Sequence, residues 1–153
     1  MSWYYNGRKV TVDHFPKEAI GFIYMMGTEI DGEMHYYIGK FMVRSERKKK
    51  LGKKELSELK KQNPGKRVRD WKMVPFTKDF KDYYSSNSTL ENIKSKGGTI
   101  HRAIISLCYS KLDLTFQEVE YIVKSDALRK DHYLNDNILG KFYKSKLQTK
   151  KEK

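Results

Sequence analysis

Hydrophobic positions in the first third of the chain fall in short runs separated by turn residues, which is the pattern of β-strands. Two runs rich in Tyr, Ile and Phe predict strands over roughly Phe22–Met26 and His35–Phe41, with a turn at Asp31-Gly32 between them. Upstream, Asn6-Gly7 lies between extended residues and predicts a hairpin with a left-handed two-residue turn. We therefore expect this part of the chain to contain two β-hairpins.

Beyond residue 84 the pattern becomes helix, strand and helix. The stretch "SSNSTLENIKSKGG" predicts a helix in which Ser88 and Glu91 form a capping box, and Gly97-Gly98 supply the left-handed exit. The apolar stretch "TIHRAIISLC" follows and predicts a third strand of the main sheet.

The stretch "TFQEVEYIVKSDAL" predicts an amphipathic helix whose apolar face carries Phe116, Val119 and Val123. Thr115 and Glu118 have the spacing of a capping box, which would place the start of this helix at Thr115. On local evidence alone, Glu118 is therefore best interpreted as a helix cap.

Together these elements predict an α/β (α+β) fold, with a small three-stranded mixed or antiparallel sheet flanked by helices and preceded by an N-terminal hairpin. The length of 153 residues suits one domain. We expect a single domain over residues 1–143, with a basic insertion at 44–72. Residues 144–153 are expected to form a lysine-rich flexible tail.

Positive charge is concentrated in the middle of the chain. The protein has 32 Lys and Arg against 19 Asp and Glu, a net charge of +13, and residues 40–72 hold 14 basic and four acidic residues. A segment this basic indicates a polyanionic partner, most commonly nucleic acid. The alternative is a solvated helix, "ELSELKK" ended by Pro64-Gly65, with a loop and no partner.

What the sequence lacks excludes several classes of function. No apolar run approaches twenty residues and there is no long basic amphipathic helix, so we expect no membrane partner. Cys108 is the only cysteine, which rules out an internal disulfide and paired-ligand zinc fingers. Phosphate-binding glycine loops and a signal-peptide pattern are also absent. A reduced, cytoplasmic setting is expected.

The predicted strands belong to a longer, ordered set of short motifs. In chain order these are "WYYNG", "GFIY", "YYIGK", "RDWK", "DYYSS", "HRAIISLC", "FQEVE" and "YLNDN", from about Trp3 to Asn137. This order resembles the GIY-YIG nucleases and, within them, the phage-encoded Seg-type homing endonucleases. The resemblance implies a GIY-YIG-like fold and a metal-dependent endonuclease that acts on DNA in the cytoplasm of a phage-infected host cell.

The name-giving tripeptides of that family appear here as "FIY" and "YIG", and each carries one tyrosine of interest. By resemblance, Tyr24 would be the general base or would position the attacking water, and Tyr37 would orient the water or the phosphate. Neighbouring strands can place both phenols on one face of the sheet. A phenol has a pKa of about 10, so we expect a nearby metal, Lys or Arg to lower it. The alternative is that both are ordinary strand aromatics.

The resemblance also assigns the charged residues of the site. Arg47, eight residues beyond the glycine of "YIG", would contact the scissile phosphate, with Lys40 and Arg102 as helpers. Glu118 would be the single carboxylate that holds Mg²⁺ or Mn²⁺, and Glu120, on a different side of the helix, is the reserve ligand. The residues expected to support the site are Gly39, Tyr84 and Asn135.

Double-stranded DNA is the expected partner, and a homodimer is one way in which both strands could be cut. Contacts to phosphate would provide affinity without choosing a sequence. The residues expected to bind DNA are Arg44, Lys48, Lys49, Lys50, Lys53, Lys54, Arg67, Arg69, Lys72 and Arg102.

Four positions depart from the family pattern, and they motivate a second hypothesis. Phe22 and Ser85 stand where glycines are usual, Phe41 replaces a common lysine, and Leu134 interrupts the "YN" dipeptide. These departures are compatible with a catalytically inactive nucleic-acid-binding protein that retains the fold. A third, weaker alternative is a small structural protein associated with RNA, suggested only by size and charge.

Overall fold

The computed structural model describes residues 1–147 and divides the chain into two compact units. The first unit comprises Met1–Val43 and Lys78–Lys153, and the second comprises Arg44–Thr77. The first unit contains a five-stranded mixed sheet with the strand order β2-β1-β7-β3-β4. Its strands are β1 (Trp3–Tyr5), β2 (Arg8–Val10), β3 (Gly21–Ile30), β4 (Glu33–Met42) and β7 (His101–Cys108).

The two predicted hairpins are confirmed. β3 pairs with β4 from Gly21↔Met42 to Ile30↔Glu33, and the two turn residues between them, Asp31 and Gly32, both have positive φ. β1 and β2 are joined in the same way through Asn6 and Gly7, which also have positive φ. Two consecutive left-handed residues match the twist of the flanking strands, which explains why both turns could be predicted from the sequence.

The predicted three-stranded sheet is wrong in its size. β1 runs parallel to β7 with the register Trp3↔Arg102, so the N-terminal hairpin becomes part of the main sheet and raises it to five strands. All other pairs in this sheet are antiparallel. A parallel pair between residues about one hundred positions apart leaves no local trace in the sequence, because it depends on which edge of β7 remains open.

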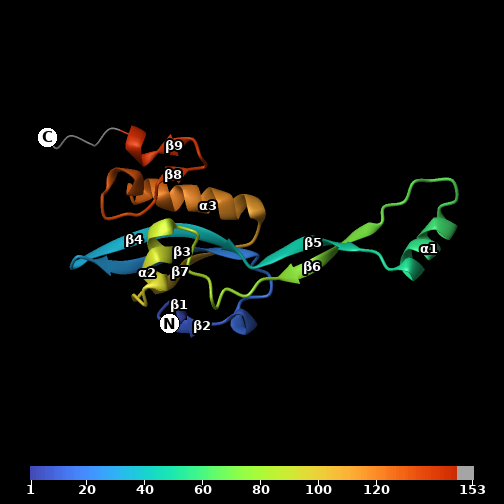
Figure 1. Ribbon diagram of the computed structural model, residues 1–153, viewed down its shortest axis with the longest axis horizontal. Coiled ribbons are helices and arrows are strands. Elements are labelled where there is room, and N and C mark those ends of the chain that lie inside the picture. The colour runs from blue at the N-terminus through green and yellow to red at the C-terminus, as the bar shows by residue number, and fades with distance from the viewer. Residues whose placement is uncertain (148–153) are drawn as a thin grey trace. The chain divides into compact units, whose positions relative to one another are not determined.

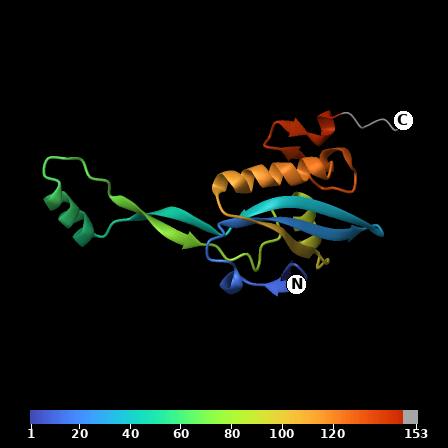
Figure 2. The same cartoon turned by 180° about the vertical axis from the view of Figure 1, so that it is seen from behind.

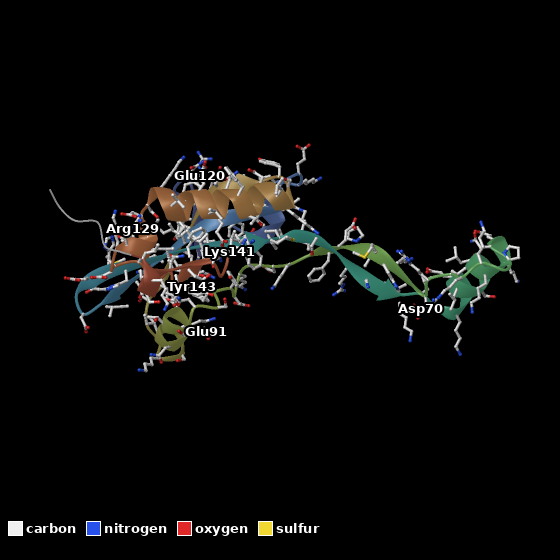
Figure 3. All side chains as sticks on the ribbon, turned by 90° about the horizontal axis from the view of Figure 1, so that it is seen from above. Asp70, Glu91, Glu120, Arg129, Lys141 and Tyr143 are labelled. Carbon is white, nitrogen blue, oxygen red and sulfur yellow. The ribbon has the colours of Figure 1, made fainter. Side chains whose placement is uncertain are left out.

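Two helices cover opposite faces of this sheet. α2 (Ser88–Ser95) contributes Leu90 to a core that contains Trp3, Phe22 and Tyr24, whereas α3 (Lys111–Lys124) packs on the other face. α3 lies along the sheet in Figures 1 and 2. Figure 3 shows Glu91 on α2 and Glu120 on α3 on opposite sides of the strands. Among the described residues, no helix is both long and apolar enough to cross a membrane.

The helix starts differ from the predictions. α2 is capped by Asn87, whose side chain accepts hydrogen bonds from the backbone N–H groups of Thr89 and Leu90, so Ser88 is the first helical residue and not the cap. Ser110 caps α3 by accepting from the N–H of Asp113. α3 therefore begins several residues before Thr115, and the interpretation of Glu118 as a cap is wrong.

The predicted apolar face of α3 is also wrong. Phe116 is 62% exposed and Val123 is 61% exposed, whereas Leu114 and Ile122 are buried against the sheet. Val119 is partly buried beside that core. Because α3 carries apolar residues on more than one side, periodicity alone could not identify the side that packs.

The segment after α3 returns to the sheet. Residues Ala127–Arg129 form a 3-10 helix, and the backbone around Tyr133 then bonds to the free edge of β4 at Tyr36. A small hairpin follows, with β8 (Asn137–Ile138) paired to β9 (Phe142–Tyr143). Lys144–Lys146, in the predicted tail, form a 3-10 helix in which Lys144 donates to the carbonyls of Lys130 and Tyr133. Residues 148–153 of that tail lie outside the described residues.

The second unit is a two-stranded ribbon. β5 (Arg44–Lys50) pairs antiparallel with β6 (Trp71–Thr77) over seven residue pairs, and α1 (Lys53–Gln62) lies in the connection between them (Figure 1). The helix and its end before Pro64-Gly65 were predicted, with Gly65 in a left-handed conformation. The strands were not predicted, because β5 reads "RSERKKK" and has no apolar alternation.

Candidate active site

Two tyrosines lie side by side in the centre of the first unit. Tyr24 on β3 stands opposite Gly39 on β4, and Tyr37 lies two residues along β4 on the same face. The ring centroids of the two tyrosines are 6.2 Å apart. The prediction that both phenols share one patch is confirmed. The register of β3 against β7 shifts between Ile23 and Tyr24, and such a bulge can re-aim a side chain.

Tyr24 is almost completely buried. Its side chain is 1% exposed, and its Oη lies 3.1 Å from Oη of Tyr83. Burial raises the pKa of Tyr24 far above the ordinary tyrosine value, and the neighbouring Tyr83 raises it further. The pKa of Tyr24 is therefore raised in the protein without metal, and its lowering by a bound metal stays a prediction. At neutral pH the Tyr24 hydroxyl is a hydrogen-bond donor or acceptor and not a phenolate.

Ser85 connects the two phenols and was not identified as a site residue from the sequence. The Ser85 hydroxyl interacts with both Tyr24 and Tyr37 and lowers the pKa of each, against the larger effect of burial, which raises both. Ser85 is buried, its Oγ accepts from the N–H of Asn87 at 3.1 Å, and its φ is 71°. The left-handed backbone explains why glycine is usual here and why serine is strained.

Glu118 and Lys40 meet on the α3 side of β4. Burial raises the pKa of the Glu118 carboxyl, and the charge and backbone of Lys40 act in the opposite direction. Lys40 Nζ donates to Oγ1 of Thr115 at 3.0 Å, which holds the ammonium group on α3 one turn before Glu118. Glu118 also raises the pKa of Tyr37, so the carboxylate and that phenol are within electrostatic reach of each other.

A polar cavity of about 410 Å³ lies at the edge of β4, beside Tyr37 and Glu118. Tyr37 and Glu118 line it together with the start of α2, residues 135–137 and Leu139. Asp136 is a second carboxylate on its wall, and it also raises the pKa of Tyr37. Asp136 was not predicted as a site residue from the sequence. In "YLNDN" it lies between two asparagines, and the family pattern points to the first of these, Asn135.

Asn135 and Gly39 support the site through the backbone of β4. The Asn135 amide donates Nδ2 to the carbonyl of Ile38 at 2.8 Å, and its Oδ1 accepts from the N–H of the same residue at 3.1 Å. Ile38 lies between Tyr37 and Gly39, so this pair of bonds fixes the strand that carries the tyrosine. A Cβ added at Gly39 would lie 2.3 Å from Oη of Tyr24.

Arg102 does not have the role that the sequence predicted. Its side chain is 2% exposed, and the guanidinium donates to the carbonyls of Met1, Lys81 and Tyr83. It also lies 4.0 Å from the ring centre of Tyr84. The prediction that Arg102 binds DNA is wrong. A buried guanidinium that donates to three backbone carbonyls stabilises the fold and is not exposed to a ligand. Tyr84 contributes to the same packing.

Glu120, the reserve ligand, points elsewhere. Its carboxylate forms an ion pair with Lys124 at 3.7 Å on α3 and does not line the cavity. Arg47 belongs to the ribbon unit, where its guanidinium lies 4.4 Å from the ring centre of Phe76. The other residues expected to bind DNA also lie on the ribbon unit, on β5 (Arg44, Lys48, Lys49, Lys50), at the start of α1 (Lys53, Lys54), before β6 (Arg67, Arg69) and on β6 (Lys72).

The carboxylates that line the cavity suit a Mg²⁺ site with few protein ligands, in which water or substrate phosphate supplies the others. Among residues 1–147 there is no group of three or more His, Cys, Asp or Glu side chains close enough to hold a metal. Mg²⁺ commonly takes only one or two protein carboxylates and keeps water or substrate phosphate as its other ligands. The partly buried carboxylate of Glu118, in a polar cavity that Asp136 also lines, fits this requirement.

One of three comparisons with known proteins found a match. Residues 3–138 match the family model described as "Putative endonuclease segE, GIY-YIG domain". The matched range includes both tyrosines, Glu118 and Asn135, as well as the whole ribbon unit. Comparisons with curated proteins and with solved structures found no match. The family match confirms the resemblance that the order of motifs indicated.

Proposed function

This chain belongs to the SegE-type GIY-YIG endonuclease family, and we propose that it is a metal-dependent endonuclease that hydrolyses phosphodiester bonds of double-stranded DNA. The observation that carries the proposal is the cavity at the edge of β4, where Tyr37 and Glu118 face the same polar space. Tyr24, Ser85 and Lys40 lie next to these two residues. The family and the phage-type motif order make a homing or DNA-processing role in an infected cell the proposed setting.

Each side chain has a task that its surroundings support. Glu118 would hold Mg²⁺ or Mn²⁺, which would neutralise charge on the phosphate when bound, and Asp136 lines the same cavity. Tyr37, the more accessible phenol, would orient the phosphate or the attacking water by hydrogen bonding. Tyr24, protonated and buried, would hold Tyr37 and the β4 backbone in position. In this proposal Tyr24 acts as base only if binding of metal and substrate lowers its pKa.

Lys40 and Arg47 are proposed as the cations that act on phosphate. Lys40 is held by Thr115, and its charge acts on the Glu118 carboxyl that lines the cavity. Arg47 would bind two phosphate oxygens through its planar guanidinium. Its exposed position on β5 supports binding to phosphate, and its assignment to the scissile bond rests on the family spacing.

Cleavage of supercoiled plasmid tests the proposal. Wild type with Mg²⁺ should nick or linearise the plasmid, and EDTA should abolish cutting. Glu118→Gln should reduce cleavage by roughly a hundredfold or more while binding DNA normally, since a metal ligand is lost but no basic residue is changed. Glu120→Gln is the matched control on the same helix, because Glu120 pairs with Lys124 outside the cavity, and it should cut like wild type.

Each outcome of this experiment has one interpretation. Binding without cleavage by any variant and with either metal would show the second hypothesis to be right, namely an inactive nucleic-acid-binding protein. Loss of cleavage in Glu120→Gln but not in Glu118→Gln would indicate that Glu120, the reserve ligand, binds the metal. Preference for RNA over DNA in competition would favour the structural RNA-associated alternative.

A further inference from the structure

The ribbon unit has no core of its own. None of its residues 44–77, all of which the structure describes, is buried. They include 13 basic and four acidic residues, so 34 residues carry a net charge of +9 out of +13 for the whole chain. A two-stranded ribbon without a packed face is only marginally stable in water. The chain therefore maintains an element with little internal stabilisation and strong self-repulsion.

The pairing register divides the side chains of the ribbon into two different faces. One face, which we call the acid-free face, carries the pairs Ser45↔Phe76, Arg47↔Val74 and Lys49↔Lys72. The opposite face contains Glu46 besides Arg44, Lys48 and Lys50. The two faces thus differ in whether the strands themselves contribute a carboxylate to them.

Two lysines oppose each other directly on the acid-free face. Like charges in a cross-strand pair destabilise a sheet, and Lys49↔Lys72 is such a pair. Glu55 on α1 accepts from Lys72 Nζ at 3.2 Å, but this ion pair is exposed and its contribution is small. A polyanion that binds between Lys49 and Lys72 would remove the repulsion.

Aromatic rings of the ribbon unit contact several of its basic side chains. The guanidinium of Arg47 lies 4.4 Å from the Phe76 ring centre, and Lys48 Nζ lies 4.3 Å from that of Trp71. Arg69 lies over Trp71 as well, at 5.0 Å. Such contacts restrict long side chains that would otherwise be free, so less conformational entropy is lost when these cations bind a ligand.

We propose that the β5–β6 ribbon lies in the major groove of double-stranded DNA, with its acid-free face toward the base edges. The major groove, about 12 Å wide, admits a two-stranded ribbon, and seven residue pairs span about 23 Å along it. Lys49 and Lys72 on this face can donate to guanine O6 and N7, and Arg47, which is proposed to bind the scissile phosphate, adds its charge to the same face. This inference rests on the proposed function, in which double-stranded DNA is the substrate.

The proposal excludes double-stranded RNA as the ligand of the ribbon. The major groove of A-form RNA is too deep and narrow for protein side chains to read. A ribbon that bound only through its charge would bind both kinds of duplex alike, whereas one that enters the groove selects B-form DNA.

Three double variants with the same loss of charge test the inference. Binding to a short duplex is measured in EDTA over a range of salt concentrations, so that cleavage plays no part. Arg47→Gln/Lys49→Gln on the acid-free face should weaken binding about 10- to 100-fold and reduce the slope of log affinity against log salt by about 1 to 2. Lys130→Gln/Lys141→Gln, which changes two exposed lysines of the first unit, should weaken it less than about threefold. Lys48→Gln/Lys50→Gln on the opposite face should have an intermediate effect.

The groove is identified with modified probes. Methylation of guanine N7, which lies in the major groove, should abolish binding of wild type, and a minor-groove ligand should not compete. Duplex RNA should bind at least about tenfold more weakly than DNA of the same sequence. Circular dichroism of each variant checks that the ribbon strands are retained.

Several results would overturn the inference. The ribbon is not the reading element if Arg47→Gln/Lys49→Gln binds like Lys130→Gln/Lys141→Gln, even when the protein cuts DNA. The face is wrong if Lys48→Gln/Lys50→Gln has the larger effect, and the groove is wrong if the minor-groove ligand competes while N7 methylation does not. Conversely, a wild type that cuts nothing but shows the expected variant pattern would refute the nuclease proposal and support the ribbon proposal.

Discussion

The ring of Tyr24 occupies the space that a side chain at Gly39 would need. The two residues are direct partners across β3 and β4, and a Cβ built on Gly39 would meet Oη of Tyr24 at 2.3 Å and its Cζ at 2.5 Å. Tyr24 can therefore lie flat across the sheet toward Tyr37 only because its cross-strand partner has no side chain. The last glycine of "YIG" is thus explained by sterics and not by backbone conformation, since its φ is not positive.

Gly39→Ala is the first prediction that follows from this contact. The added methyl group must displace a ring that is packed on all sides, so we expect a loss of about 1–3 kcal/mol in the free energy of unfolding. Cleavage should fall with it, because Tyr24 and Tyr37 would move apart. Urea denaturation and plasmid cleavage measure the two effects. Gly52→Ala is the control, since nothing lies within 4 Å of a Cβ at that helix cap, and it should cost less than about 1 kcal/mol.

Ser85 allows the hydroxyl and the backbone to be tested separately. Ser85→Gly removes the hydroxyl and relieves the strain of a left-handed serine, so we expect higher stability, by about 1 kcal/mol, with lower activity. Ser85→Ala removes the hydroxyl but keeps a Cβ at the same φ, so activity should fall with no gain in stability.

The pH profile separates these two explanations further. The Ser85 hydroxyl lowers the pKa of both Tyr24 and Tyr37, so its loss should raise both pKa values. If Tyr24 acts as the base once metal and substrate are bound, the rising limb of the cleavage profile should move to higher pH. If Ser85→Gly cuts as fast as wild type with an unchanged profile, the hydroxyl has no part in the site.

Glu118 should make the stability of the protein depend on pH. Burial raises its pKa, so the folded protein binds this proton more tightly than the unfolded chain does. The free energy of unfolding therefore decreases as pH rises from the ordinary glutamate pKa to the raised pKa of Glu118 in the folded protein. Above that pKa the ionised carboxylate destabilises the fold. Glu118→Gln should raise the midpoint of thermal unfolding at pH 7–8 and leave it unchanged near pH 4.

Mg²⁺ should reverse the difference in thermal midpoint between wild type and Glu118→Gln. Mg²⁺ held by the Glu118 carboxylate stabilises only the protein that has the ligand, so added Mg²⁺ should raise the thermal midpoint of wild type but not that of Glu118→Gln. Glu120→Gln serves as the control here too and should respond to Mg²⁺ as wild type does. An equal response of all three proteins would place the metal elsewhere.

Asn135→Ala should destabilise the edge of β4. The substitution leaves both the N–H and the carbonyl of Ile38 without their partners in a buried position, and we expect a cost of about 2–4 kcal/mol. Hydrogen exchange of the Ile38 amide should become faster by a corresponding factor. Asn92→Ala, at an exposed position of α2, is the control and should cost nothing measurable. Similar losses in both variants would contradict a specific role for Asn135.

Local features of the sequence determined much of the fold. Asn6-Gly7 and Asp31-Gly32 identified both hairpin turns, because few residue pairs tolerate two consecutive positive φ angles. The alternating aromatic runs placed β3 and β4, and the motif order identified the family that the match over residues 3–138 confirms. Charge counting located the basic unit without any knowledge of its strands.

Only the tertiary structure decided which of these residues meet. The pairing of β1 with β7 enlarged the sheet, and the cap at Ser110 released Glu118 from the role of a helix cap. The fold buried Arg102 and brought Ser85 against both phenols. These outcomes depend on strand register and on contacts between residues far apart in the chain. Sequence patterns give turn geometry, periodicity and charge for residues that are close together in the chain. The cavity is formed by segments that are far apart in the chain, and no local pattern shows which of them come together.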